Sequence, residues 1–202
     1  MDDLVLKVFE IGILSTNAYL VYDEITKKAF IVDLPSPSKS VLDFIKKNDI
    51  KIEFVLLTHA HWDHIGGLNE VDWPFYVHNE DKELLTSAEL NGAFMIRLPF
   101  VIEREGIVYK DKVKFIDYNI DVIHIPGHTP GGVCLKIGDW LFSGDTLFRS
   151  SVGRTDLYKG SQTQILSAIR NKLFVLDDNV RVFPGHGPDT TIGDERNNNP
   201  FF

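Results

Sequence analysis

Four potential metal ligands fall within six residues, in the segment Thr58-His59-Ala60-His61-Trp62-Asp63-His64. The segment follows directly on the apolar run Phe54–Leu57, which is typical of a strand. Successive side chains on extended backbone point to opposite sides. His59 and His61 can therefore face one point, while Asp63 and His64 face a second point nearby. Imidazole and carboxylate together suit zinc, iron or manganese, so we expect part of a metal site here.

Three more candidate ligands, each preceded by a glycine, follow other short apolar runs along the chain: His128, Asp145 and His186. Two ions about 3.5–4 Å apart need more ligands than one segment provides. Ligands carried at strand ends would be held rigidly, as such a site requires. For any one of these residues alone, an ordinary loop role is the better interpretation. The seven residues taken together favour a metal site.

The elements that must position these residues are mostly strands. Apolar runs rich in β-branched and aromatic residues, separated by turn residues, predict strands. The expected strands are Leu4–Phe9, Ala18–Tyr22, Ala29–Val32, Phe54–Leu57, Lys114–Ile116, Val122–Ile125, Val133–Ile137, Trp140–Phe142 and Val180–Phe183.

Helices are expected between groups of strands. One begins with Ser36 as N-cap and Pro37 in its first turn, and carries an apolar stripe. The capping-box pattern Ser161-Gln162-Thr163-Gln164 begins a second helix, and Asn79–Ser87 predicts a third. No Pro/Gly/Ser-rich linker divides the chain. We therefore expect one layered α/β domain over residues 1–202.

Composition narrows the range of partners. The chain has 21 basic and 29 acidic residues, a formal net charge of −8, which disfavours nucleic acid and anionic membranes as partners. The start of the sequence resembles no targeting segment, and no apolar run approaches membrane-spanning length, so a cytoplasmic location is expected. The one cysteine, Cys134, excludes an internal disulfide. Two phenylalanines end the chain and predict packing on the domain or on a neighbouring subunit, which allows a homo-oligomer.

The pattern His-x-His-x-Asp-His, followed by separated His, Asp and His, resembles the metallo-β-lactamase superfamily over nearly the whole chain. The resemblance implies a four-layer αββα sandwich with two metal ions at one edge. It assigns His59, His61 and His128 to the first metal, Asp63, His64 and His186 to the second, and Asp145 to both. Histidine at position 61 differs from the flavodiiron oxygen reductases, which have glutamate. The bridging Asp145 differs from true class B β-lactamases and favours glyoxalase II.

A finer resemblance is to the short, single-domain glyoxalase II-like hydrolases, carried by segments 144–148, 153–156 and 185–196. It implies hydrolysis of thioesters such as S-lactoylglutathione by a metal-bridging hydroxide, with Asp63 holding its metal and the hydroxide proton. The expected ions are zinc, with iron or manganese as alternatives. Longer glyoxalase II enzymes bind glutathione with a lysine and a tyrosine, where this chain has Arg154 and Asp156. Arg154 is a candidate anion-binding residue or a structural partner of Asp156.

Two rival functions share these motifs. Persulfide dioxygenases have the same scaffold and, by resemblance, use one iron held at His59, His128 and Asp145. The other rival, a metal-stabilised binding protein, is disfavoured because structural sites are usually closed and four-coordinate.

Other residues have ordinary interpretations. His78 and His124 are expected to be structural, Arg149 to be solvated, and Cys134 to be a small buried hydrophobe. Asp33 could orient a ligand histidine or cap a turn.

Overall fold

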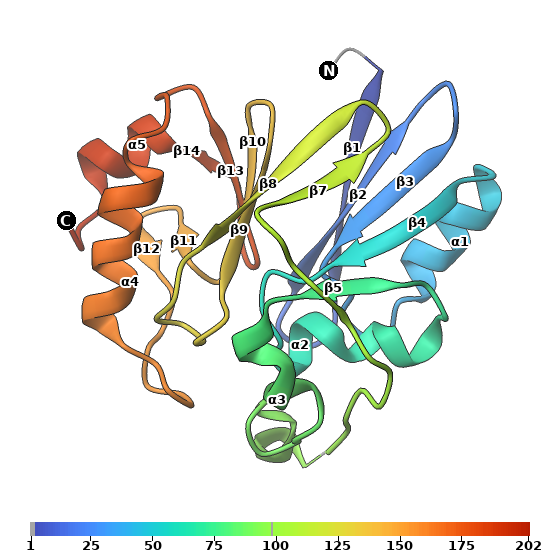
Figure 1. Ribbon diagram of the computed structural model, residues 1–202, viewed down its shortest axis with the longest axis horizontal. Coiled ribbons are helices and arrows are strands. Elements are labelled where there is room, and N and C mark those ends of the chain that lie inside the picture. The colour runs from blue at the N-terminus through green and yellow to red at the C-terminus, as the bar shows by residue number, and fades with distance from the viewer. Residues whose placement is uncertain (1–2, 98) are drawn as a thin grey trace.

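Two six-stranded sheets form the body of the protein (Figure 1). The structure is a computed structural model that describes residues 3–97 and 99–202. The first sheet has the order β1-β2-β3-β4-β5-β6, with β1 Leu4–Ile11, β2 Thr16–Asp23, β3 Lys28–Val32, β4 Lys51–Leu56, β5 Phe75–Val77 and β6 Ile107–Val108. The second has the order β14-β13-β10-β9-β8-β7, with β7 Lys112–Phe115, β8 Tyr118–His124, β9 Val133–Ile137, β10 Trp140–Gly144, β13 Arg181–Pro184 and β14 Thr190–Thr191. A hairpin of β11 (Leu147–Phe148) and β12 (Ser151–Val152) lies beside it.

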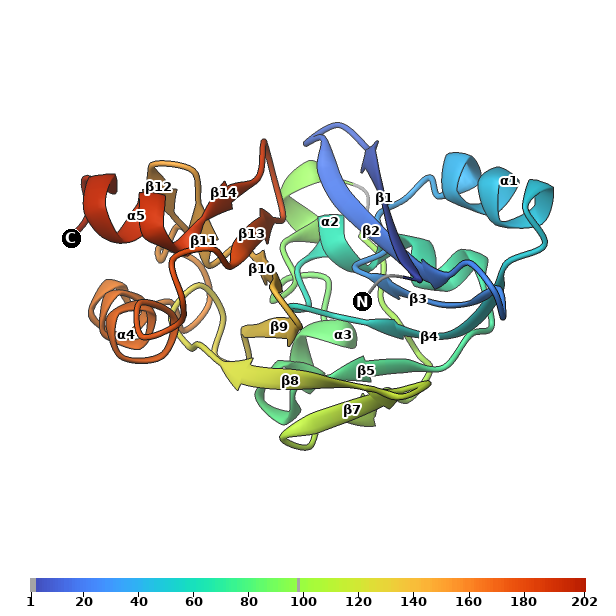
Figure 2. The ribbon, with the colours of Figure 1, turned by 90° about the horizontal axis from the view of Figure 1, so that it is seen from above.

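Helices cover the outer face of each sheet. The helices α1 (Lys39–Lys47), α2 (Trp62–Ile65) and α3 (Lys82–Leu85) contribute buried residues to one core with the first sheet. The helices α4 (Gln162–Ala168) and α5 (Ile192–Asn198) share another core with the second sheet. Figure 2 shows α1 at one side of the molecule and α4 and α5 at the other. The expected four-layer αββα arrangement is therefore confirmed.

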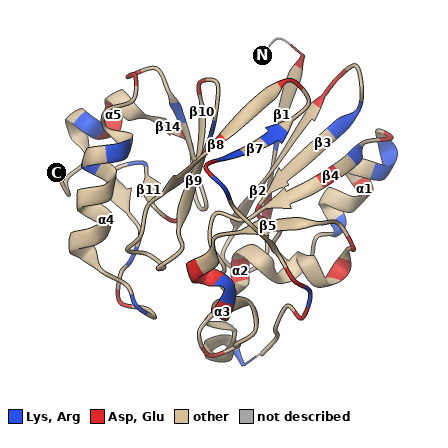
Figure 3. Ribbon diagram, viewed as in Figure 1, with Lys and Arg blue, Asp and Glu red and all other residues tan. Residues whose placement is uncertain are grey.

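Alternation along the strands explains the layers. In β2, Tyr19 and Val21 face the core between the sheets, while Ala18 and Leu20 face the helical side. Both faces are buried, so the strand is a nearly continuous apolar run. Aromatic rings fill the central core, with Phe30 and Phe115 from opposite sheets packed edge to face at 4.8 Å between ring centroids. Figure 3 shows the charged residues mainly on turns and helices around largely uncharged sheets.

Most expected strands are present within a few residues of their expected bounds, but one helix start was wrong. The N-cap of α1 is Ser38, not Ser36. The hydroxyl groups of both serines donate to the carboxylate of Glu70, 34 and 32 residues away, and neither caps the helix with its side chain. This tertiary contact moves the helix start past Pro37.

The other two helix predictions had different outcomes. The expected cap at Ser161 is confirmed, since its Oγ accepts from the Gln164 N–H at 3.3 Å, and α4 continues as a π-helical turn, Ile169–Leu173. The segment Asn79–Ser87 is divided between a 3₁₀ turn, Asn79–Asp81, and the single-turn helix α3. In the described residues, no helix combines the length and apolar character needed to cross a membrane.

The strand ends position the candidate ligands. The segment that carries His59 to His64 follows β4, and His128 lies between β8 and β9. Asp145 follows β10 and His186 follows β13, and these two strands are parallel neighbours. Parallel strands end at the same edge of a sheet, so their ligands meet there.

Candidate metal centre

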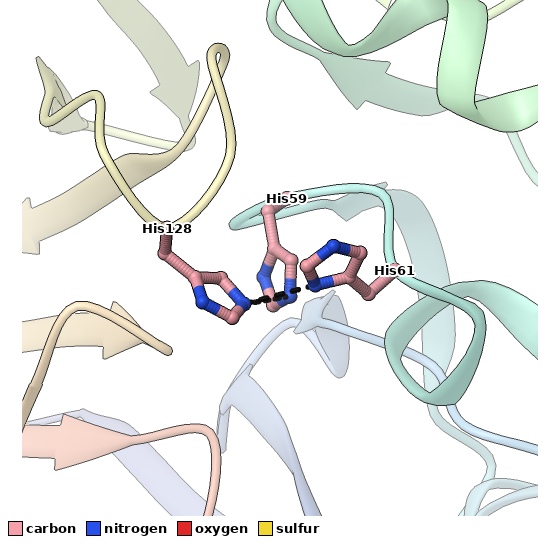
Figure 4. A group of neighbouring side chains, drawn as sticks. All are labelled: His59, His61 and His128. Carbon is pink, nitrogen blue, oxygen red and sulfur yellow. Dashed lines mark hydrogen bonds between the residues drawn. The ribbon is translucent and has the colours of Figure 1, made fainter. Parts of the chain in front are cut away.

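Three histidines form the first half of the cluster. His59 and His61 come from the turn after β4, and His128 comes from the loop after β8 (Figure 4). His128 Nε2 lies 2.9 Å from His61 Nδ1 and 3.2 Å from His59 Nε2. All three rings are buried. Three ring nitrogens converging on one point form a set that could hold a metal ion.

Asp63, His64 and His186 form the second half of the cluster. His186 Nε2 lies 3.2 Å from Asp63 Oδ2, and His64 Nε2 lies 3.6 Å from the same oxygen. Their ligand atoms all lie within 4.8 Å of one another. Asp63 also accepts a hydrogen bond from the hydroxyl of Thr16 at 3.1 Å, which fixes its carboxylate.

Asp145 lies between the two halves. Its Oδ1 is 3.3 Å from His64 Nε2, and its Oδ2 is 3.6 Å from His128 Nε2 and 3.5 Å from His186 Nε2. Two glycines allow this close packing, because a Cβ on Gly185 would collide with Asp145 and a Cβ on Gly144 would collide with Thr58. The structure thus brings all seven candidate ligands into one cluster.

The far nitrogens of four rings are anchored to the protein. His128 Nδ1 donates to the Arg154 carbonyl at 2.8 Å, and His186 Nδ1 donates to the Leu14 carbonyl at 3.0 Å. A carbonyl only accepts, so these Nδ1 atoms carry the proton and leave Nε2 facing the cluster. Such contacts fix the tautomer and the ring orientation of a metal-binding histidine.

Asp33 anchors the other two rings. Its Oδ2 accepts from His64 Nδ1 at 2.8 Å and from the Thr58 hydroxyl at 2.7 Å. The Thr58 oxygen in turn lies 3.1 Å from His59 Nδ1 and can accept its proton. Asp33 therefore orients His64 directly and His59 through Thr58, which agrees with one of its two expected roles.

The electrostatics of the cluster favour bound cations. Burial lowers the pKa of His59 and His128, and lowers that of His61 to about 3, so these rings are neutral with free lone pairs. Burial also lowers the pKa of His186, but hydrogen bonds to Asp145 and Asp63 outweigh it and raise the value to about 9. Positive charge is therefore favoured between the carboxylates.

Buried polar atoms give a further test of whether ions fit. His64 Nε2 and Asp145 Oδ1 are both buried and have no hydrogen-bond partner among the described residues. Leaving such atoms unpaired is costly. A divalent cation would satisfy both, and neutral imidazole with carboxylate is a donor set that zinc, iron and manganese accept.

A residue that the sequence analysis missed, Asp81, ties two ligand loops together. Its Oδ2 accepts from the Ala60 N–H at 3.1 Å and from the Thr129 hydroxyl at 2.9 Å, and its Oδ1 accepts from the Gly131 N–H at 2.6 Å. Ala60 separates His59 from His61, and Thr129 follows His128. Asp81 is fully buried, and its partners lie 21 to 50 residues away, so the local sequence carries no signal for this role.

Arg154 contributes to the cluster through its backbone. Its carbonyl holds His128, while its exposed guanidinium forms a bidentate pair with Asp156, with two N···O distances of 2.7 Å. The sequence left two partners open for the Arg154 guanidinium, Asp156 or a bound anion, and in the structure it pairs with Asp156. Arg154 still lines the cavity onto which the ligands open.

The remaining histidines lie outside the cluster. The rings of His78 and His124 stack at 4.1 Å, and with Glu80 they form another group whose ligand atoms lie within 4.8 Å. Two of their nitrogens already have partners: His124 Nε2 donates to the Pro130 carbonyl, and His78 Nδ1 accepts from the Glu80 N–H. These contacts fit the expected structural role. Cys134 is buried as expected, and burial raises its pKa to about 12.

Two curated relatives match almost the whole chain. The probable metallo-hydrolase YqgX of Bacillus subtilis is 35% identical over 205 residues, which cover 95% of this chain and 94% of the relative. The hydroxyacylglutathione hydrolase GloC of Haemophilus influenzae is 32% identical over 206 residues, covering 97% of each chain.

Two solved structures have the same fold over their full length. The BLEG-1 B3 metallo-beta-lactamase is 34% identical with a TM-score of 0.91, covering 98% of this chain and 99% of the other. TTHA1623, in a di-iron-bound form, is 32% identical with a TM-score of 0.86, covering 97% and 100%. The model of the metallo-beta-lactamase superfamily matches residues 11–186, a range that contains all seven clustered ligands. The chain therefore belongs to the metallo-beta-lactamase superfamily.

Proposed function

We propose that the protein is a thioester hydrolase with two divalent metal ions. The observation that carries this proposal is the position of Asp145, whose two oxygens lie near ligands of both halves of the cluster. A carboxylate in that position can hold both ions at the separation that a dinuclear site needs. The proposed ligands are His59, His61 and His128 for one ion, Asp63, His64 and His186 for the other, and Asp145 for both.

Bound ions would polarise a substrate carbonyl and lower the pKa of a water molecule toward neutrality. The chain's own residues set the geometry of that chemistry. In the metal-free protein, burial raises the pKa of Asp63, but the charge of His64 and the His186 hydrogen bond outweigh it and lower the pKa, so Asp63 is a carboxylate. With Thr16 donating to its Oδ2, Asp63 is placed to accept a proton from the attacking water.

The thioester substrate class rests on similarity and on the sequence motifs. GloC is named a hydroxyacylglutathione hydrolase, and its similarity extends over 97% of this chain. We propose S-lactoylglutathione and other small thioesters as substrates. Arg154 is a less direct candidate for binding them, since its charge is paired with Asp156.

Hydrolysis of β-lactams is a second candidate. The similarity to a structure named a B3 metallo-beta-lactamase favours it. By family resemblance, the bridging position of Asp145 favours a glyoxalase II-like thioesterase over a β-lactamase. The ligand cluster itself is compatible with both reactions. Both substrate classes present a carbonyl to the same ions.

The test is a substrate panel on protein loaded separately with zinc, iron or manganese. The panel holds S-lactoylglutathione, S-acetylglutathione, a chromogenic cephalosporin, and glutathione persulfide with oxygen uptake recorded. We expect thioester hydrolysis that is lost in Asp145→Ala and retained in Asp23→Asn, which changes the last residue of β2, at the opposite end of that strand from Thr16. Turnover of the cephalosporin alone would support the second candidate. Oxygen uptake with one iron per chain would instead indicate a persulfide dioxygenase.

A further inference from the structure

An apolar pocket with a volume of about 360 Å³ lies beside the cavity onto which the metal ligands open. Its walls include Ile11, Ile13, Pro35, Pro37 and Phe100. Among the described residues that line it, Asp63 alone carries a charge. The pocket thus extends from a candidate metal ligand into an apolar environment.

The two cavities meet at a shared wall. Leu14, Trp62, Asp63 and Ile96 line both of them. A molecule whose carbonyl lies at the cluster could therefore place one substituent in the apolar pocket and the other in the ligand cavity. The volume is near the lower end of the roughly 300–1,000 Å³ typical of small-molecule sites, which suits part of a ligand.

The wall formed by the β1–β2 turn is tied to the metal cluster. The Leu14 carbonyl accepts from Nδ1 of His186, a candidate ligand. The strand that follows is fixed as well, because the Asn17 side chain donates to the carbonyls of Pro184 and Gly187 on either side of His186. The pocket and the cluster therefore keep a defined relative position.

The turn also exposes apolar side chains at the pocket. Ile13 is 79% exposed and Leu14 is 49% exposed. Single exposed apolar residues are common, but these two line a concave apolar surface that continues to a reactive centre. Binding an apolar group there would remove both the group and the wall from water.

We propose that this pocket binds the acyl group of the substrate and makes the enzyme prefer short apolar acyl chains over the polar lactoyl group. The inference rests on the proposed thioester hydrolysis. Carrier thiols of biological thioesters are polar, so the acyl group is the part of the substrate that matches an apolar pocket. The thiol portion then lies in the cavity beside the metal ligands.

The first experiment measures kcat/KM for acetyl, butanoyl, hexanoyl and lactoyl thioesters of one thiol, glutathione. Each methylene that enters the pocket should raise kcat/KM about fourfold, the factor that corresponds to burying one methylene. The value of kcat/KM should be higher for the butanoyl thioester than for the lactoyl thioester. A value that stays constant from acetyl to hexanoyl, with all four hydrolysed, would overturn the pocket assignment and leave the hydrolase proposal intact.

The second experiment compares two exposed isoleucines. Ile13→Ser should lower the hexanoyl-to-acetyl ratio of kcat/KM by about fourfold or more, since at least one methylene contact is lost. Ile25→Ser is the matched control, because Ile25 is 75% exposed in the turn after β2. Eight strand residues separate the two turns by about 25 Å. Equal ratios in both variants would contradict the proposal.

Binding without turnover separates this inference from the proposed function. Calorimetry with S-methyl-, S-butyl- and S-hexylglutathione, which are thioethers and cannot be hydrolysed, should show the same gain of about fourfold per methylene in the metal-loaded protein. If no thioester is hydrolysed but this gain is present and lost in Ile13→Ser, the pocket is supported and the hydrolase proposal fails. If the affinity does not change along the series, and the protein is a dimer that Ile13→Ser dissociates, the apolar surface binds a second copy of the chain instead.

Discussion

Removing one acceptor from Asp33 should weaken metal binding without unfolding the protein. The carboxylate accepts three hydrogen bonds, from His64 Nδ1, the Thr58 hydroxyl and the Thr58 N–H. In Asp33→Asn, one oxygen becomes an NH₂ group, so at least one of these donors faces another donor. The backbone is not the cause of the loss, because Asn tolerates the positive φ of 55° at this position.

The magnitude follows from what Asp33 holds. It orients one ligand of each half of the cluster, and loss of such a partner typically weakens metal affinity by about 10–100-fold. That corresponds to about 1.4–2.8 kcal/mol. Competition with a chromophoric zinc chelator measures the affinity, and circular dichroism checks the fold.

Asp23→Asn is the matched control. Asp23 is also a buried aspartate that accepts local hydrogen bonds, from the N–H and hydroxyl of Thr26, but it is the last residue of β2, at the end of the strand away from Thr16 and the cluster. It should bind zinc as tightly as the wild type. Affinity within twofold of the wild type in Asp33→Asn, with the fold intact, would refute this account of how the ligands are oriented.

Three further predictions concern residues around the cluster. Burial raises the pKa of Asp81 to about 6, from 3.8, so its contribution to stability is present below pH 3.8 and lost as the pH rises through 6. In metal-free protein, the unfolding free energy of the wild type relative to Asp81→Asn should thus fall by about 2 kcal/mol between pH 4 and 7, measured by urea denaturation. A constant difference would contradict this prediction. Arg154→Ala keeps the carbonyl that holds His128, and the lost pair with Asp156 is exposed. It should therefore change kcat/KM equally for acidic and neutral thioesters, whereas a selective loss on acidic thioesters would show direct anion binding. His78→Ala should leave metal content unchanged by elemental analysis, and loss of an ion would mean that the ligand set is misassigned.

The ligand cluster could be predicted from the sequence because its members are marked locally. Each follows an apolar strand, and glycines permit the close approach that the structure shows at Gly144 and Gly185. The residues alone predicted a layered α/β domain, and the four-layer αββα arrangement came from the family resemblance. The strands β2 and β3, buried on both faces, show why layers cover both sides of the first sheet. Several strands were not anticipated because they are only two or three residues long, too short for a periodic pattern.

Residues that support the cluster were harder to predict because their partners are distant in the chain. Asp33 lies 31 residues from His64, so the sequence allows two roles for it, and only the hydrogen bond between the two side chains distinguishes them. The Arg154 carbonyl leaves no trace in the sequence, since every residue has one. The prediction of Ser36 as a helix cap was wrong because its partner is also distant in the chain. The Ser36 hydroxyl donates to Glu70 and not to the nearby helix.

The central claim is that Asp145 joins two metal sites in one chain. Elemental analysis of the protein titrated with zinc or iron, with thioester hydrolysis followed in parallel, tests it most directly. We expect activity to require two ions per chain, and Asp145→Ala to lose both bound metal and activity. Full activity at one ion per chain, with Asp145→Ala retaining it, would contradict the account.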